Sequence, residues 1–331
     1  MAEGFAWEEI LRRMIAAEAS DLHIAPDQCV RMRLDGVLVP EIFTPTAHDM
    51  DCMLDTMLTD AQRVTLHRSD VDFAWVYLGR RFRGNAYRMQ NGVGLALRLL
   101  PKRIPTPEMI GMPAALRALA AARDGLALVC GATGAGKTTT LAALIEMINQ
   151  TQRAHIITLE DPIEYVFSPA QSFLSQREAG RDFSAFPHAV RAALREDPDV
   201  LLIGEIRDRA TMEAALMAAT TGVLVLGTLH TRSAAQTALR VESLFAADVR
   251  DAVRVQFADV LTGIFAQRLL PHVGGGRIAA FEVLTATPAV RSMLRQGSYG
   301  QLASVMMSGA AQGMQTAEMG EAVLRSKGLI A

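Results

Sequence analysis

The stretch "GATGAGKTTT" at residues 131–140 decides the fold, because it contains a complete phosphate-binding motif. Its glycines, lysine and threonine match G-x-x-x-x-G-K-S/T at every fixed position. The apolar run "LALVC" at 126–130 comes directly before the motif and is typical of a buried strand. A helix is expected to begin near Thr138, so the motif has the strand, loop and helix context in which it binds nucleotide phosphates. The alternative, a glycine-rich turn that binds nothing, is disfavoured because every fixed position is present.

The residue types of this motif each have a part in holding a triphosphate. Glycines allow the tight turn that points backbone N–H groups at phosphate oxygens, and the following helix adds the positive end of its dipole. We expect Lys137 to reach the β and γ phosphates and the Thr138 hydroxyl to bind Mg²⁺. ATP and Mg²⁺ are therefore the predicted ligands. The loop residues predicted to hold them are Gly131, Thr133, Gly134, Ala135, Gly136, Lys137, Thr138 and Thr139.

The composition bounds the remaining possibilities. Half of the 331 residues are apolar, enough for one large core or two modest ones, and the formal net charge is −2 at pH 7. Such a charge gives no general reason to expect a nucleic-acid partner. The uncharged run from Ala214 to Leu229 has 16 residues, fewer than the ~20 needed to cross a bilayer, and the N-terminus lacks an export signal. We therefore expect a cytoplasmic protein without a membrane span.

Prolines divide the chain into two parts. Four of the 13 residues in "PKRIPTPEMIGMP" at 101–113 are proline, which prevents a regular element from crossing this segment. We predict an interdomain linker here, with a small mixed α/β domain over 1–100 and a nucleotide-binding domain with a helical C-terminal region over 114–331. Within the first domain, "VRMRLDGVLV" alternates apolar and polar residues around an Asp35-Gly36 turn and predicts a hairpin.

After the linker, apolar runs alternate with helical patterns in the manner of a mainly parallel α/β sheet. The runs are "LALVC", "HIITL", "VLLIG" and "VLVLG". Ligands of such sheets bind beyond the carboxyl ends of the strands, where this chain has Glu164, Glu205 and His230. We expect Glu205 to support Mg²⁺. We expect His230 to contact the γ-phosphate or the attacking water, and so to sense whether that phosphate is still attached.

Four stretches, in this order and spacing, resemble the Walker A motif, Asp box, Walker B motif and His box of the type II/IV secretion ATPases. They are "GATGAGKTT", "ITLEDPIEY", "LREDPDVLLIGEIRD" and "TGVLVLGTLHT". The resemblance extends from "ASDLHIAPD" near the start to "GMQTAEM" near the end. The short N-terminal region, the lack of a cysteine quartet for zinc, "AVRSMLRQG" and "GMQT" make the chain similar to the branch of the family that retracts type IV pili.

The resemblance implies a PAS-like N-terminal domain followed by a RecA-like P-loop ATPase domain. It implies a homo-hexameric motor that hydrolyses ATP to retract pili, located in the cytoplasm and peripherally at the inner membrane. A pilus platform protein and a second ATPase of the same type are the implied partners. By motif position, Glu164 is the base for water, Glu205 supports the metal and His230 senses phosphate. Three arginines of the first domain, Arg81, Arg83 and Arg98, would neutralise charge on the phosphates in the transition state. The alternative is that these arginines only lie on solvent-exposed faces of strands.

Three positions depart from the family pattern. Thr220 and Val223 stand where the His box usually has Glu and His, and Ser292 stands where the C-terminal motif usually has Asn. These departures admit an accessory ATPase that works beside a principal motor, and a pilus-assembly or secretion ATPase is the other alternative. A GTPase is disfavoured because no Asn is followed by Lys, and a nucleic-acid translocase because Lys and Arg form no basic block.

Overall fold

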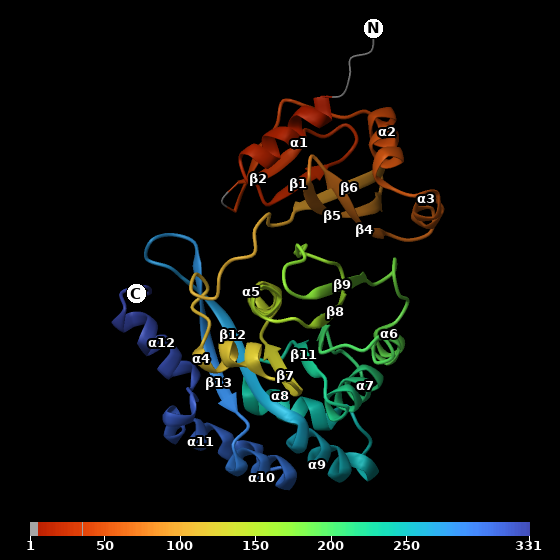
Figure 1. Ribbon diagram of the computed structural model, residues 1–331. Helices are drawn as coiled ribbons and strands as arrows, with labels where there is room; N and C mark the ends of the chain where they lie inside the picture. The colour runs from red at the N-terminus through yellow and green to blue at the C-terminus, as the bar shows by residue number, and fades with distance from the viewer. Residues whose placement is uncertain (1–5, 35) are drawn as a thin grey trace. The chain divides into compact units, whose positions relative to one another are not determined.

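The computed structural model describes residues 6–34 and 36–331, and the chain divides into two compact units between Arg103 and Ile104 (Figure 1). Each unit has its own sheet and its own hydrophobic core. The boundary falls inside the proline-rich segment 101–113. Beyond it, Ile104 packs against the core of the second unit, so the later part of this segment belongs to that unit.

Six antiparallel strands form the sheet of the first unit, in the order β3-β2-β1-β6-β5-β4. The predicted mixed α/β character is confirmed, whereas the PAS-like character stays a prediction. β2 and β3 pair as the predicted hairpin, whose turn residue Asp35 lies outside the described residues. The elements are α1 (Ala6–Ala16), β1 (Asp21–Ile24), β2 (Arg31–Leu34), β3 (Val37–Pro40), α2 (Ala47–Met57), α3 (Asp60–Leu66), β4 (Val71–Tyr77), β5 (Arg80–Met89) and β6 (Gly92–Leu99).

Helix α2 illustrates how the first unit is built. The Thr46 hydroxyl accepts from the Asp49 N–H while the Asp49 carboxylate accepts from the Thr46 N–H, and this reciprocal cap starts the helix. Met53 and Leu54 then lie on its inner face, and both are fully buried. They belong to one cluster with sheet residues such as Leu97, so the apolar stripe of the helix covers one face of the sheet.

The sheet of the second unit has the order β13-β12-β7-β11-β10-β8-β9, and its neighbouring strands are parallel except for β12 with β13. The four predicted strands are present as β7, β8, β10 and β11, and the predicted helical C-terminal region is present after β13. The elements are α4 (Ala114–Arg117), η1 (Ala118–Ala121), β7 (Gly125–Cys130), α5 (Lys137–Thr151), β8 (His155–Glu160), β9 (Phe173–Glu178), α6 (Phe186–Ala193), β10 (Val200–Ile203), α7 (Arg209–Thr220), β11 (Leu224–Leu229), α8 (Ala234–Ser243), η2 (Ala247–Val249), α9 (Arg250–Val260), β12 (Leu261–Pro271), β13 (Arg277–Thr285), α10 (Pro288–Gln296), η3 (Tyr299–Gln301), α11 (Leu302–Ser308), η4 (Ala310–Gln312) and α12 (Ala317–Ser326).

Both faces of this second sheet are covered. Along β7, Leu126, Leu128 and Cys130 lie in one buried cluster, and Ala127 and Val129 lie in another. Helices α6 and α7 contribute to the first cluster and α5 to the second. Because both faces of the sheet are buried, the sequences of its central strands are continuous apolar runs. Because β7, β10 and β11 are parallel, their carboxyl ends reach the same edge of the sheet.

The uncharged run from Ala214 to Leu229 is divided between two elements. Helix α7 ends at Thr220, Gly222 turns the chain with a φ of 92°, and β11 begins at Leu224. This confirms the prediction of a helix end followed by a core strand. Within the described residues, no helix combines the length and the hydropathy that crossing a bilayer would require.

Candidate functional site

The phosphate loop joins β7 to α5. β7 ends at Cys130 and α5 begins at Lys137. Between them, three glycines adopt positive φ angles that other residues rarely take, 154° at Gly131, 77° at Gly134 and 85° at Gly136. These angles fold the loop so that its backbone N–H groups can surround an anion. The loop therefore has the local geometry that the sequence motif predicts.

Lys137 turns back into the loop. It is 8 % exposed, and Nζ donates to the carbonyl oxygens of Gly131 at 2.8 Å and of Ala132 at 3.1 Å. Burial lowers the pKa of Lys137, and the negative charge of Glu205 acts in the opposite direction. An ammonium group that has already lost much of its water is well suited to exchange these carbonyls for phosphate oxygens.

Glu205 and His230 meet at the loop although they follow different strands. His230 Nε2 lies 2.9 Å from Glu205 Oε1, and His230 Nδ1 lies 3.4 Å from the Thr133 hydroxyl oxygen. The imidazole therefore bridges the carboxylate that follows β10 to the phosphate loop that follows β7. The parallel arrangement of the strands predicts this convergence, whereas the roles assigned to the two residues stay predictions.

Arg207 is a site residue that the sequence analysis missed. Its guanidinium contacts both oxygens of Glu205, Nε with Oε1 at 2.6 Å and Nη2 with Oε2 at 2.7 Å. Burial raises the pKa of Glu205, but the hydrogen bond from Arg207 and the charges of His230 and Arg207 together outweigh it and lower the pKa below its usual value. A signal was present in "GEIRD", which places Arg two residues after Glu and so on the same side of an extended segment.

Glu164 belongs to the segment after β8, and its neighbour Tyr165 connects that segment to the start of α5. Tyr165 Oη lies 3.0 Å from Thr139 Oγ1, and Tyr165 is 5 % exposed. Thr138 and Glu164 are both half-buried. Burial raises the pKa of Tyr165, and the charge of Glu164 adds to this effect. The segment that carries the predicted base is therefore tied to the phosphate motif through Tyr165, while the role of Glu164 stays a prediction.

Thr138 and Glu205 are the predicted ligands of Mg²⁺. Hydroxyl and carboxylate oxygens suit this ion, which usually keeps several waters and takes further ligands from nucleotide phosphates. Among residues 6–34 and 36–331, no group of three or more His, Cys, Asp or Glu side chains could hold a metal ion. A hydroxyl and a carboxylate are donors that fit a cation bound together with a nucleotide.

A cavity of about 390 Å³ lies against the β12 side of the loop. This volume is within the range of small-molecule sites. Residues 131–135 line it from the loop, and Gln267 and Leu269 line it from β12. Its positive charge suits an anionic ligand. That charge comes from three arginines that the sequence analysis did not single out, Arg232, Arg268 and Arg277.

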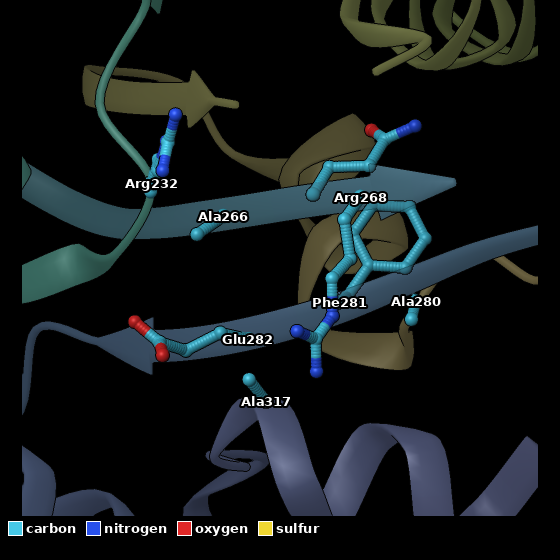
Figure 2. Close-up of a pocket in the computed structure, with 8 residues that line it drawn as sticks. Arg232, Ala266, Arg268, Ala280, Phe281, Glu282 and Ala317 are labelled. Atoms are coloured by element: carbon cyan, nitrogen blue, oxygen red, sulfur yellow. The ribbon is translucent and has the colours of Figure 1, made fainter. Parts of the chain in front are cut away.

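A smaller cavity of about 50 Å³ lies beside β12 and β13 (Figure 2). Figure 2 shows Arg268 on β12 and Glu282 on β13 near Ala317, the first residue of α12. Arg268 pairs with Glu321 of α12, and Glu282 accepts from the Ala234 N–H at 2.6 Å, at the start of α8. Burial raises the pKa of Glu282. The space is sufficient for a few water molecules at most, so we interpret this region as the junction of two helices with the strand pair.

The three predicted arginines lie on β5 and β6 of the first unit. Arg83 and Arg98 are directly opposite each other on these strands, and both are exposed. Arg98 Nε donates to Asp21 Oδ1 at 2.8 Å, whereas Arg81 is half-buried. Their contact with a nucleotide stays a prediction.

A glycine loop between a parallel strand and a helix, a buried lysine, and polar groups from further strand ends define a P-loop nucleotide-binding domain. The family model described as "Type II/IV secretion system protein" matches residues 4–275. The chain therefore belongs to this family, which is the one that its motifs resemble.

Relatives match over nearly the full chain. The uncharacterized protein YggR of Escherichia coli is 44% identical over 93% of this chain and 95% of its own length. The type IV pilus retraction ATPase PilT of Pseudomonas aeruginosa is 39% identical over 97% of this chain and 94% of its own length. The type IV pilus ATPase PilU of the same organism is 38% identical over 94% of this chain and 82% of its own length. The crystal structure of the pilus retraction motor PilT with bound ADP has a TM-score of 0.91 and 40% identity, covering 99% of this chain and 95% of that one. The fold is thus an N-terminal domain followed by a RecA-like ATPase domain.

Proposed function

We propose that the chain is an ATP-hydrolysing motor that retracts type IV pili and so powers twitching motility. One observation carries the enzymatic part: His230 bridges Glu205 to Thr133 of the phosphate loop, at 2.9 and 3.4 Å. Loss of a terminal phosphate beside these groups would change the charge that both experience, which is what a sensor of hydrolysis requires. The likeness to the PilT retraction ATPase and motor supports the mechanical part.

The residues of the site would divide the reaction among them. Lys137 and the loop N–H groups would bind the β and γ phosphates, and Glu164 would orient and deprotonate the attacking water. When bound with ATP, Mg²⁺ would neutralise charge on the phosphate oxygens, and Thr138 and Glu205 would hold it. His230 would pass the change of charge to Glu205 and so to the segment that leads into α7.

We further propose a homo-hexameric ring in the cytoplasm, peripheral at the inner membrane, with a pilus platform protein and a second ATPase of the same type as partners. In such a ring, the first unit of a neighbouring subunit could bring arginines to the phosphates. Arg83 and Arg98 are both exposed, but Arg98 donates to Asp21, so Arg83 is the better candidate. No nucleic-acid partner is proposed, since the formal net charge of −2 provides no attraction to phosphate backbones.

ATP turnover by the purified chain tests the enzymatic part. We expect Mg²⁺-dependent hydrolysis by the wild type, and a loss of about a hundredfold or more in Glu164→Ala because the water would lose its base. Glu213→Gln is the matched control, since Glu213 is an exposed carboxylate on α7, and its turnover should equal that of the wild type. Absence of turnover in the wild-type chain would exclude a motor.

Deletion of the gene tests the mechanical part. Loss of twitching with surface pili retained or increased would indicate retraction. Loss of surface pili altogether would assign the chain to pilus assembly instead. Complementation by the wild-type gene, but not by the Glu164→Ala gene, would connect the phenotype to hydrolysis.

An accessory ATPase beside a principal motor is the second candidate. Thr220 donates to the Met217 carbonyl at 2.7 Å at the end of α7, and Val223 is 6 % exposed, so neither position presents the charged or imidazole group usual in the His box. The likeness to the pilus ATPase PilU agrees with this candidate. Expression of the chain in a strain that lacks its principal retraction motor separates the two. Restored twitching would indicate an independent motor, and no restoration would indicate an accessory role.

A further inference from the structure

We propose that Gln267 is a positioning residue that holds the phosphate loop in the shape required to bind ATP and ADP. This inference rests on the proposed nucleotide site and assigns it a residue outside its sequence motifs. β12 pairs in parallel with β7, and Ala266 is the partner of Cys130 in that register. Gln267 follows Ala266 directly, so it lies level with Gly131, the first residue of the loop.

The Gln267 amide makes two hydrogen bonds, one to the loop and one to the helix that follows it. Nε2 donates to the Ala135 carbonyl at 2.8 Å, and Oε1 accepts from the Thr140 hydroxyl at 2.8 Å. Gln267 is 5 % exposed and Thr140 is 1 % exposed, so water has little access to either bond. The two contacts bracket residues 136–139, whose N–H groups and hydroxyls are the expected phosphate and Mg²⁺ ligands.

The loop also passes close to Gln267 at two of its glycines: a side chain at Gly131 would clash with the Gln267 backbone, and one at Gly136 would force the Gln267 amide to move. A Cβ on Gly131 would lie 2.4 Å from the Gln267 backbone oxygen, and a Cβ on Gly136 would lie 2.9 Å from Gln267 Nε2. At Gly134, by contrast, a Cβ would meet nothing within 4 Å, so that glycine serves the backbone turn alone. Gln267 therefore packs against both ends of the loop in addition to bonding to it.

The chemistry of the side chain matters at this position. Glutamine offers a donor and an acceptor without adding a charge beside the triphosphate. Glutamate would keep an acceptor for Thr140 but lose the donor to Ala135, and methionine, which has a similar shape, would lose both. The next residue, Arg268, pairs with Glu321 of α12.

Titration calorimetry with ADP, together with KM and kcat for ATP, tests the inference. In Gln267→Met, the dissociation constant of ADP and the KM for ATP should both rise about tenfold, with kcat falling less than about threefold, because the loop shape serves ground state and transition state alike. Thr140→Val removes one of the two bonds and should change the same parameters in the same direction by less. Gln315→Met is the matched control: its amide donates to the Phe281 carbonyl at 2.8 Å in the same unit, and its loss should leave ADP binding unchanged.

Wild-type ADP affinity in both Gln267→Met and Thr140→Val would overturn the inference. A lower melting temperature without weaker ADP binding would also overturn it, because that result identifies a structural role only. If Gln267→Met does not fold, Thr140→Val decides alone, with weaker ADP binding supporting the inference and unchanged binding overturning it. A wild-type chain that binds no ADP would instead refute the proposed nucleotide site itself.

Discussion

The β11 side and the β12 side of the phosphate loop are built from different chemistry. On the β11 side, His230 lies 2.9 Å from Glu205 and 3.4 Å from the loop, and its side chain is 44 % exposed. On the β12 side, the Gln267 amide makes two hydrogen bonds of 2.8 Å and the residue is 5 % exposed. The first side contacts the loop through titratable groups, an exposed imidazole and a carboxylate whose side chain is 19 % exposed. The second side contacts the loop through a neutral, buried amide, beside the cavity that the three arginines line.

This difference indicates how one loop can be both stable and responsive. Contacts between exposed charges contribute little to stability, and they change whenever a neighbouring charge changes. Buried neutral hydrogen bonds are costly to break, because the groups left behind find no water as a partner. We infer that the β12 side preserves the shape of the loop through the reaction while the β11 side responds to the charge of the nucleotide.

Lys137 lies within the loop that the two sides hold, and its removal should have the largest effect. We expect Lys137→Ala to lower kcat/KM for ATP by about a hundredfold or more, because a preorganised, partly desolvated cation is lost from the β and γ phosphates. ADP should also no longer raise the melting temperature of the variant. Lys327→Ala, at the exposed end of α12, is the control. Wild-type kinetics in Lys137→Ala would mean that the phosphates bind elsewhere, and the comparison of the two sides would lose its basis.

His230→Ala tests the division between the two sides directly. We expect kcat to fall about tenfold, corresponding to ~1.4 kcal/mol, while the affinity for ADP stays near that of the wild type because the β12 side still holds the loop. Steady-state kinetics and ADP calorimetry measure both quantities. His188→Ala removes an exposed imidazole from α6 and is the control. Equal losses of ADP affinity in His230→Ala and Gln267→Met would contradict the division.

The β11 side could be predicted from the sequence, and the reason is physical. Buried parallel strands are continuous apolar runs, so β7, β8, β10 and β11 were recognisable. The carboxyl ends of parallel strands share one edge, which brought Glu205 and His230 to the phosphate motif. Asp199 lies at the opposite end of these strands, where its carboxylate accepts from the His155 N–H. The pairing of Glu205 with Arg207 was missed: "GEIRD" places both residues on one side of an extended segment, but whether they pair depends on side-chain rotamers.

The β12 side could not be predicted, for a different reason. β12 follows α9 without a break at Val260, and it carries Gly263, Gln267 and Arg268, so no apolar run separates it from its surroundings. The contact of Gln267 with Ala135 spans 132 positions along the chain. Such a contact depends on the strand order of the whole sheet, which local periodicity does not specify. For the part of the chain after β13, the sequence analysis named a helical C-terminal region without its individual helices α10 to α12.

The pKa of Glu205 provides a smaller test of the charged side. The lowered pKa means that the stability contributed by its carboxylate is present above the usual pKa of 4.5 and is lost as the pH falls through the lowered value. Arg207→Ala should lower the melting temperature at pH 7 by no more than about 2 °C, because the Arg207 side chain is 72 % exposed. Melting curves at decreasing pH should show this difference shrinking to nothing, and no such trend in the exposed control Arg123→Ala. A difference that grows on acidification would mean that Arg207 does not hold an ionised Glu205.

The smallest expected effect concerns Tyr165, which joins the segment of Glu164 to the loop through Thr139. One hydrogen bond contributes about 1 kcal/mol, so Tyr165→Phe and Thr139→Val should each lower kcat by about fivefold or less. Each single variant leaves the other hydroxyl without its partner, and the double variant removes both. The double variant should therefore lose less than the product of the two single losses, as kinetics on all four proteins would reveal. Multiplicative losses would show that the two hydroxyls act independently. The segment of Glu164 would then need another connection to the phosphate loop, and the β11 and β12 sides would remain as the two structural supports of the site.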